Sequence, residues 1–143
     1  MANFFPQGMQ LPASSRDTAG FWEACREHRL VVQRCMQCGS YRMVPLPVCY
    51  NCQSFEWEWE QSDGTGEVFS YTIVIHSTHP GTREVVPYNA IVVKLNDCGQ
   101  MKLTSNMVEC ENEEIHVGMP VELAWEDTTP EVTMPRFRPA RKA

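Results

Sequence analysis

Two closely spaced cysteine pairs constrain the fold of this 143-residue chain more than any other feature. Cys35 and Cys38 form one C-x-x-C motif, and Cys49 and Cys52 form a second one after ten intervening residues. Two such knuckles place four thiolates at the corners of a tetrahedron, which is the geometry of a closed structural zinc site. The sequence therefore predicts a zinc ribbon in which these four cysteines bind Zn²⁺.

Residue types alone leave other uses of the four cysteines open. They could be buried thiols or disulfides, although the paired spacing disfavours this reading. Iron also fits an all-sulfur tetrahedron, as it would in a free-standing redox protein. Zinc is favoured because nothing else in the sequence suggests electron transfer. A site without an open position indicates a structural role for the metal and not a catalytic one.

Charge and composition limit the partners and the location of the protein. The chain has 12 Lys and Arg residues against 18 Asp and Glu residues, and its net charge is −6. Nucleic-acid binding needs clustered cations, so this balance weighs against it.

The first residues lack a secretory pattern and no segment is long and apolar enough to span a membrane, so we expect a cytoplasmic protein without a membrane span. Cys25, Cys98 and Cys110 are interpreted as small hydrophobic residues.

The pattern around the cysteines predicts a mostly β chain with one N-terminal helix. Residues 1–13 have no period and read as an arm that lies on the surface or on a partner, whereas residues 15–30 predict an amphipathic helix of about three turns. A short strand at 30–34 leads into the first knuckle, and residues 55–60 alternate as a half-buried strand with Trp57 and Trp59 on one face. Further segments rich in β-branched and aromatic residues predict strands at 67–75, 88–95, 101–108 and 121–125. A compact β-barrel is the economical arrangement, because closing a small sheet removes its edges.

The sequence offers no self-sufficient catalytic set. His76 and His79 follow the end of a predicted strand, Glu84 is nearby and His116 precedes another strand. No nucleophile, base and orienting group stand at a recognised spacing. The chain is therefore predicted to assist a reaction and not to carry it out alone.

The order of the motifs resembles the rubredoxin-like zinc-ribbon plus OB-fold family, whose members are accessory subunits of thiolase-like, acyl-CoA-handling enzymes. The resemblance covers residues 18–140, and Tyr50 departs from it by following the third cysteine where many members have proline. It is carried by the aromatic segment 21–24, the strand 30–34 before Cys35-x-x-Cys38-Gly39, Pro45-x-Pro47-x-Cys49-x-x-Cys52, Gly64-x-Gly66-x-Val68-x-Ser70-Tyr71-Thr72, Pro87-Tyr88 and Gly118-Met119-Pro120-Val121. The resemblance implies an arm and helix at 1–31, a zinc ribbon at 32–60, and an OB-fold barrel with a C-terminal tail at 61–143.

The family's activity sets the functional expectation. The resemblance implies a non-catalytic subunit that binds a thiolase-fold partner in a heterotetramer, stabilises it and completes its channel for a CoA thioester. The partner would perform thiolysis, retro-aldol cleavage or acyl transfer, and degradation of aromatic or steroid-type compounds is the expected setting. A single-stranded nucleic-acid-binding module is the alternative, since OB barrels and zinc ribbons also serve that purpose.

Two groups of residues are predicted to carry this function. Arginine side chains match phosphate oxygens, so Arg136 and Arg138, with Phe137 between them, are candidate ligands of the CoA phosphates. Apolar side chains of the arm, the helix and the ribbon are candidate anchors for the partner. These anchors are Phe4, Phe5, Met9, Leu11, Phe21, Trp22, Met43 and Leu46.

Overall fold

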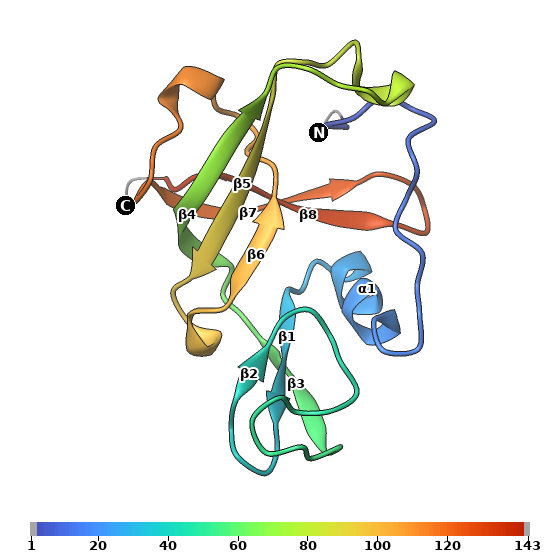
Figure 1. Ribbon diagram of the computed structural model, residues 1–143, viewed down its shortest axis with the longest axis vertical. Coiled ribbons are helices and arrows are strands. Elements are labelled where there is room, and N and C mark those ends of the chain that lie inside the picture. The colour runs from blue at the N-terminus through green and yellow to red at the C-terminus, as the bar shows by residue number, and fades with distance from the viewer. Residues whose placement is uncertain (1–2, 142–143) are drawn as a thin grey trace.

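The computed structural model describes residues 3–141, so the ends of the predicted domains at 1–2 and 142–143 lie outside the described residues. The described chain is mostly β with one α-helix, as predicted, and its strands form two antiparallel sheets (Figure 1). The elements in chain order are α1 (Ala19–Arg26), β1 (Val31–Cys35), β2 (Tyr41–Arg42), β3 (Trp57–Gln61), β4 (Thr65–Val74), η1 (Pro80–Thr82), β5 (Tyr88–Leu95), η2 (Cys98–Gln100), β6 (Lys102–Ser105), η3 (Asn112–Glu114), β7 (Pro120–Asp127) and β8 (Thr133–Pro139). No helix in residues 3–141 is long and apolar enough to cross a membrane.

The helix α1 is shorter than the predicted helix at residues 15–30. Thr18 occupies the N-cap position, but its hydroxyl accepts a hydrogen bond from the Ser15 backbone N–H at 3.0 Å and so closes a turn before the helix begins. At the other end, His28 adopts a positive φ of 58°. Because this backbone conformation cannot continue a right-handed helix, the chain turns there toward β1.

The smaller sheet has the order β2-β1-β3 and carries the zinc ribbon. β1 lies at its centre, and all five of its residues pair with β3, from Val31 opposite Gln61 to Cys35 opposite Trp57. The rings of Trp57 and Trp59 meet edge to face with centroids 4.8 Å apart. The prediction of a half-buried strand with both tryptophans on one face is therefore confirmed.

The larger sheet has the order β6-β5-β4-β7-β8 and curls into the OB-like barrel. Its first four strands in sequence correspond to the four predicted segments, but the prediction that the fourth strand ends the series is wrong. β8 follows and pairs with β7 along its whole length. An isolated parallel bridge between Met107 and Phe137, with a hydrogen bond from the Val108 N–H to the Phe137 carbonyl, joins the two ends of the sheet. The closing strand thus comes from the segment that was predicted as a tail.

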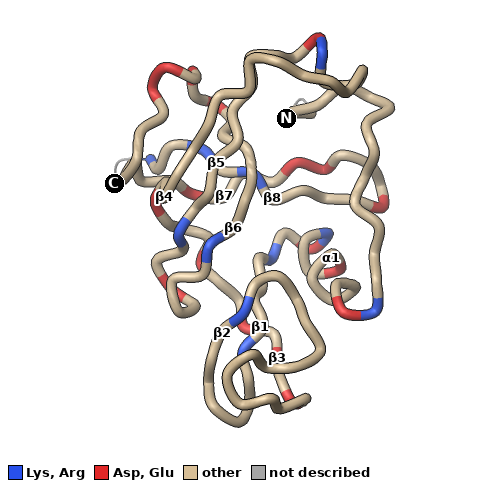
Figure 2. The backbone as a smooth tube through the Cα atoms, viewed as in Figure 1, with Lys and Arg blue, Asp and Glu red and all other residues tan. Residues whose placement is uncertain are grey.

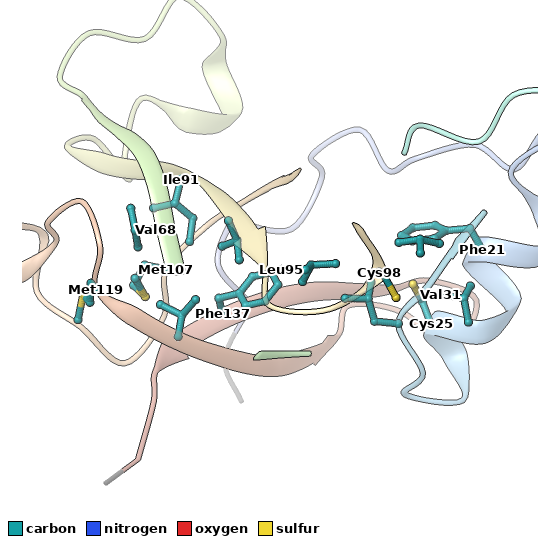
Figure 3. Close-up of a cluster of buried hydrophobic side chains, with 14 of the residues drawn as sticks. Phe21, Cys25, Val31, Val68, Ile91, Leu95, Cys98, Met107, Met119 and Phe137 are labelled. Atoms are coloured by element: carbon teal, nitrogen blue, oxygen red, sulfur yellow. The ribbon is translucent and has the colours of Figure 1, made fainter. Parts of the chain in front are cut away.

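A single hydrophobic core connects the barrel with the helix and the ribbon. Figure 3 shows Cys98 between Leu95 of the barrel and Cys25 and Val31 on the helix and ribbon side. Burial raises the pKa of both the Cys25 and the Cys98 thiols to about 12, so both stay protonated and act as small hydrophobic residues. The ribbon is consequently packed on the barrel through a shared core and is more than a tethered appendage.

Candidate metal centre

The four predicted ligands converge on one point of the ribbon. The sulfur atoms of Cys35, Cys38, Cys49 and Cys52 all lie within 4.8 Å of one another. The Cys35 and Cys52 sulfurs are 3.5 Å apart, and those of Cys38 and Cys49 are 3.6 Å apart. A tetrahedron with Zn–S bonds of about 2.3 Å has sulfur–sulfur edges of roughly 3.8 Å, so this arrangement fits one Zn²⁺. The donor set is closed and would hold the metal in a structural role.

The two knuckles use the same backbone geometry. The Gly39 N–H donates to the Cys35 carbonyl, and the Gln53 N–H donates to the Cys49 carbonyl, each at 3.0 Å. Gly39 and Gln53 both have a positive φ, at 79° and 64°. Each turn therefore needs the left-handed conformation at the fourth residue after its first cysteine, and glycine meets that need without strain in only one of them.

Hydrogen-bond donors lie beside the cysteine sulfurs. The backbone N–H groups of Gln37 and Asn51 donate to the sulfurs of Cys35 and Cys49, each at 3.4 Å, and the Asn51 side-chain amide lies 3.6 Å from the Cys38 sulfur. Hydrogen bonds from Ser40, joined by the one from Asn51, lower the pKa of Cys38 to about 5. At Cys52 the balance is the opposite: a backbone hydrogen bond from Ser54 lowers its pKa, but burial and hydrogen bonds with the other three cysteines raise it to about 12. Such outer contacts orient and tune metal ligands. The sequence analysis did not find the contact of Asn51 with sulfur, because it depends on how the two knuckles fold together.

Two buried polar side chains fix the loop between the knuckles. Gln33 accepts a hydrogen bond from the Leu46 N–H at 2.8 Å, and Arg42 donates to the Leu46 carbonyl through two nitrogens, at 2.9 and 3.2 Å. Both side chains are buried, and Cα pairing in the sheet places Gln33 opposite Arg42. This clamp holds the backbone of Leu46 while its side chain stays 48% exposed. Sequence reasoning did not find the clamp, because it depends on a cross-strand pair.

The predicted partner anchors occupy different environments in the chain. Leu11 and Leu46 are exposed, while Met9, Trp22 and Met43 are half-buried. Phe4 and Phe5 pack on the ring of Tyr88, with centroids 6.4 and 5.2 Å away. Phe21 differs from the rest, because it is a core residue of this chain and leaves almost no surface for a partner. The partner interface itself stays a prediction.

The three predicted CoA-phosphate ligands lie on β8, and the barrel already uses them. Phe137 is fully buried in the core. Arg136 is buried and forms an ion pair with Glu126 at 3.4 Å. Arg138 donates to Glu122 at 3.0 Å and to Glu109 at 3.4 Å, and about a quarter of its side chain is exposed. Of the three, Arg138 is the side chain with the most access to a ligand, and the phosphate role stays a prediction.

The remaining candidates form no catalytic arrangement within residues 3–141. The His79 imidazole accepts a hydrogen bond from the Gly81 N–H and so caps η1, and the His116 imidazole contacts the Glu114 carbonyl. The four knuckle cysteines form the one cluster of possible metal ligands found among the described residues. The part of the chain that the structure describes thus contains one cysteine cluster suited to a structural metal and no assembled catalytic set.

Comparison with known proteins assigns the family. Residues 22–58 match the model of the ChsH2 rubredoxin-like zinc ribbon domain, and residues 59–126 match that of the ChsH2 C-terminal OB-fold domain. A chain in the solved structure of the Ltp2-ChsH2(DUF35) aldolase is 40% identical in sequence and superposes with a TM-score of 0.82. The match covers 92% of the present chain and 100% of that chain. The chain belongs to the ChsH2 (DUF35) family. The predicted zinc ribbon and OB-fold are confirmed by these matches.

Other proteins similar to this chain are longer or more distant from it. The probable enoyl-CoA hydratase alpha subunit of Thermomonospora curvata is 41% identical over 129 residues, which are 90% of this chain and 39% of the relative. The 3-oxo-4,17-pregnadiene-20-carboxyl-CoA hydratase alpha subunit of Mycobacterium tuberculosis is 31% identical over 85% of this chain and 38% of its own length. The chain thus spans about two fifths of these curated relatives. A DUF35 protein of unknown function from Sulfolobus solfataricus shares the fold, with a TM-score of 0.63, 16% identity, and coverage of 89% of this chain and 87% of its own.

Proposed function

We propose that this chain is the non-catalytic, zinc-binding subunit of a heteromeric thiolase-like enzyme that cleaves or forms carbon–carbon bonds in acyl-CoA thioesters. The observation that carries the proposal is the 40% identity over the full length of a chain from an aldolase complex. The absence of a catalytic arrangement in residues 3–141 supports it, because the chemistry then belongs to a partner. When bound, Zn²⁺ supplies no reaction chemistry and stabilises the ribbon.

The names of the relatives support a CoA thioester as the shared substrate. Two curated relatives are called hydratase alpha subunits that act on CoA esters, and one of these esters has a steroid nucleus. For the present chain we propose a substrate of the same chemical class, in a thiolase or retro-aldolase reaction that degrades aromatic or steroid-type compounds. The proposed role is to stabilise the partner and to complete its CoA-substrate channel.

The proposed partner is a thiolase-fold subunit, and the proposed assembly is a heterotetramer. The surface of this chain offers apolar side chains on fixed backbone, such as Leu46, which the clamp of Gln33 and Arg42 holds in place. Anchors on fixed backbone bind with little loss of conformational entropy. Figure 2 shows Lys and Arg interspersed with Asp and Glu along the backbone, an arrangement that does not favour the alternative of a nucleic-acid-binding module.

Purification of the tagged chain from its native cells is expected to yield a stoichiometric complex. We expect a thiolase-fold protein to remain bound through gel filtration, and intact and peptide mass spectrometry will identify it. The variant Leu46→Asp should weaken this complex at least tenfold, because it buries a charge in an apolar contact. Val117→Asp, which changes an exposed apolar residue of the barrel, is the matched control. A lone, zinc-loaded monomer would contradict the proposal and make titration with single-stranded nucleic acid the next experiment.

Replacement of Arg138 by alanine tests the contact with CoA. If the guanidinium binds a CoA phosphate, we expect the apparent KM of the complex for its CoA substrate to rise several-fold with little change in kcat. Arg34→Ala is the control, since Arg34 is another partly exposed arginine that pairs with a single carboxylate, that of Glu60. An unchanged KM in Arg138→Ala, measured by steady-state kinetics of the assembled complex, removes Arg138 as a phosphate ligand.

A further inference from the structure

The N-terminal arm, residues 3–12, lies against the barrel between two loops. In Figure 1 it passes η1 in the β4–β5 connection and the tip of the β7–β8 hairpin before it reaches α1. The Asn3 side-chain amide lies 3.5 Å from the Thr128 carbonyl in the β7–β8 turn. The Met9 side chain packs so closely on Gly81 of η1 that a Cβ atom at residue 81 would clash with the Met9 sulfur. The connections between the first and second strands and between the fourth and fifth strands of an OB-fold flank its ligand-binding face.

The arm leaves a cavity of about 370 Å³ between itself and the barrel. A volume of this size lies at the lower end of the range of about 300–1,000 Å³ that is typical of small-molecule sites. The apolar part of its wall consists of Phe5, Met9, Leu11 and Met134, together with prolines of the arm. The arm brings three of these four side chains, so the cavity exists because the arm is in place.

The polar part of the wall carries two charges that cancel each other. Glu126 and Arg136 line the cavity and form a buried ion pair. The second carboxylate oxygen of Glu126 accepts a hydrogen bond from Thr128, and the first accepts one from the Phe4 N–H at 2.6 Å. Arg136 also donates to Asn106 at 2.7 Å. Because both groups are already paired, the wall offers no unpaired charge to a charged ligand, whose burial would be costly.

The arm still has hydrogen-bonding capacity to offer. Residues 3–14 make no backbone–backbone hydrogen bond with the described residues, whereas such bonds begin at Ser15. The side chains of Gln7, Gln10 and Thr129 also line the cavity. A small number of polar groups in a mostly apolar wall is the composition that orients a ligand.

We propose that this cavity is a binding site for a small neutral molecule with an apolar body and one or two hydrogen-bonding groups, and that the arm is its outer wall. The residues that line the cavity all belong to this chain, so binding is tested on the isolated protein. If the cavity binds no such molecule, the proposed accessory role is unaffected, because that role is tested separately by complex formation.

The first test titrates the full-length protein with Nile red, a neutral apolar dye. We expect saturable 1:1 binding with enhanced fluorescence, and binding of the anionic dye anilinonaphthalene sulfonate that is at least tenfold weaker. Leu11→Arg places a charge in the wall and should weaken Nile red binding at least tenfold. Val117→Arg is the control, because Val117 is an exposed apolar residue outside the cavity, and this variant should bind Nile red as the wild type does. Equal binding of both dyes, or no effect of Leu11→Arg, overturns the proposal.

A second test locates the dye directly. In protein labelled with ¹³C at the methionine methyl groups, Nile red should shift the NMR signals of Met9 and Met134. The signal of Met36, which is exposed on the first knuckle, should not move. A shift of Met36 without shifts of Met9 and Met134 would show that the dye binds the ribbon, and the cavity would then be rejected as its site.

Discussion

Replacement of Cys49 by serine is expected to unfold the zinc ribbon and to abolish stoichiometric metal binding. Cys49 is buried, and its sulfur is one corner of a closed tetrahedron with no spare ligand. Structural zinc contributes about 10–16 kcal/mol of apparent binding energy in small zinc domains, and this energy is available only to the folded state. A whole domain is stable by only about 5–15 kcal/mol. Loss of one ligand can therefore remove most of the stability of the ribbon.

The effect should extend into the barrel, because the ribbon and the barrel share one core. Leu30, Val31 and Val32 at the start of the ribbon belong to the same buried cluster as Leu95 and Phe137 of the barrel. We expect the midpoint of urea unfolding to fall for the protein as a whole, with the zinc content, measured by inductively coupled plasma mass spectrometry, falling from about one ion per chain to a small fraction.

The control for this experiment is Cys110→Ser. Cys110 is half-buried and lies outside the metal centre, so its replacement should keep both the metal and the unfolding midpoint. A chelator should reproduce the effect of Cys49→Ser in the wild type. If Cys49→Ser kept a full complement of zinc with an unchanged midpoint, the four-cysteine site would be wrong. The same mass measurement separates zinc from iron, which fits the same sulfur geometry.

The metal centre and most of the strands were predictable from the sequence because their signals are local. The two knuckles follow from the spacing of the cysteines, and the strands at β3, β4 and β5 follow from alternation and from β-branched residues. The family resemblance added the OB-fold, which the matches confirm. These features depend on residues that are neighbours in the chain.

The features that were missed depend on residues far apart in the chain. Pro135 and Pro139 make β8 hard to predict as a strand, because proline has no backbone N–H to donate to a neighbouring strand. β8 lies at the end of the sheet, where a missing N–H donor is tolerated. Arg136 was predicted as a ligand of the CoA phosphates, but its partners Glu126 and Asn106 come from other parts of the barrel. The burial of an arginine follows from such long-range pairing and cannot be read from local pattern.

Replacement of Arg136 by methionine is expected to destabilise the barrel by about 3–5 kcal/mol, because it leaves the Glu126 carboxylate buried without its cation. The side chains of Glu126 and Arg136 are only 1% and 7% exposed. Urea denaturation at neutral pH measures the loss. Arg138→Met is the matched control on the same strand: its ion pairs are partly exposed, so the expected loss is about 0–1 kcal/mol. A loss in Arg136→Met no larger than in the control would show that the buried pair does not stabilise the fold.

The dependence on pH separates an electrostatic cause from loss of packing. Burial alone would raise the pKa of Glu126, but hydrogen bonds from Thr128 and the Phe4 N–H, together with the charge of Arg136, lower it below the ordinary value of 4.5. The stabilisation by this carboxylate is therefore fully present above that value and is lost as the pH falls through the lower pKa of the folded state. In Arg136→Met the carboxyl keeps its burial without the cation, so its pKa should rise and a proton should relieve the buried charge. The stability difference between wild type and Arg136→Met should then shrink between about pH 7 and about pH 5, whereas a difference caused by lost packing would stay constant over that range.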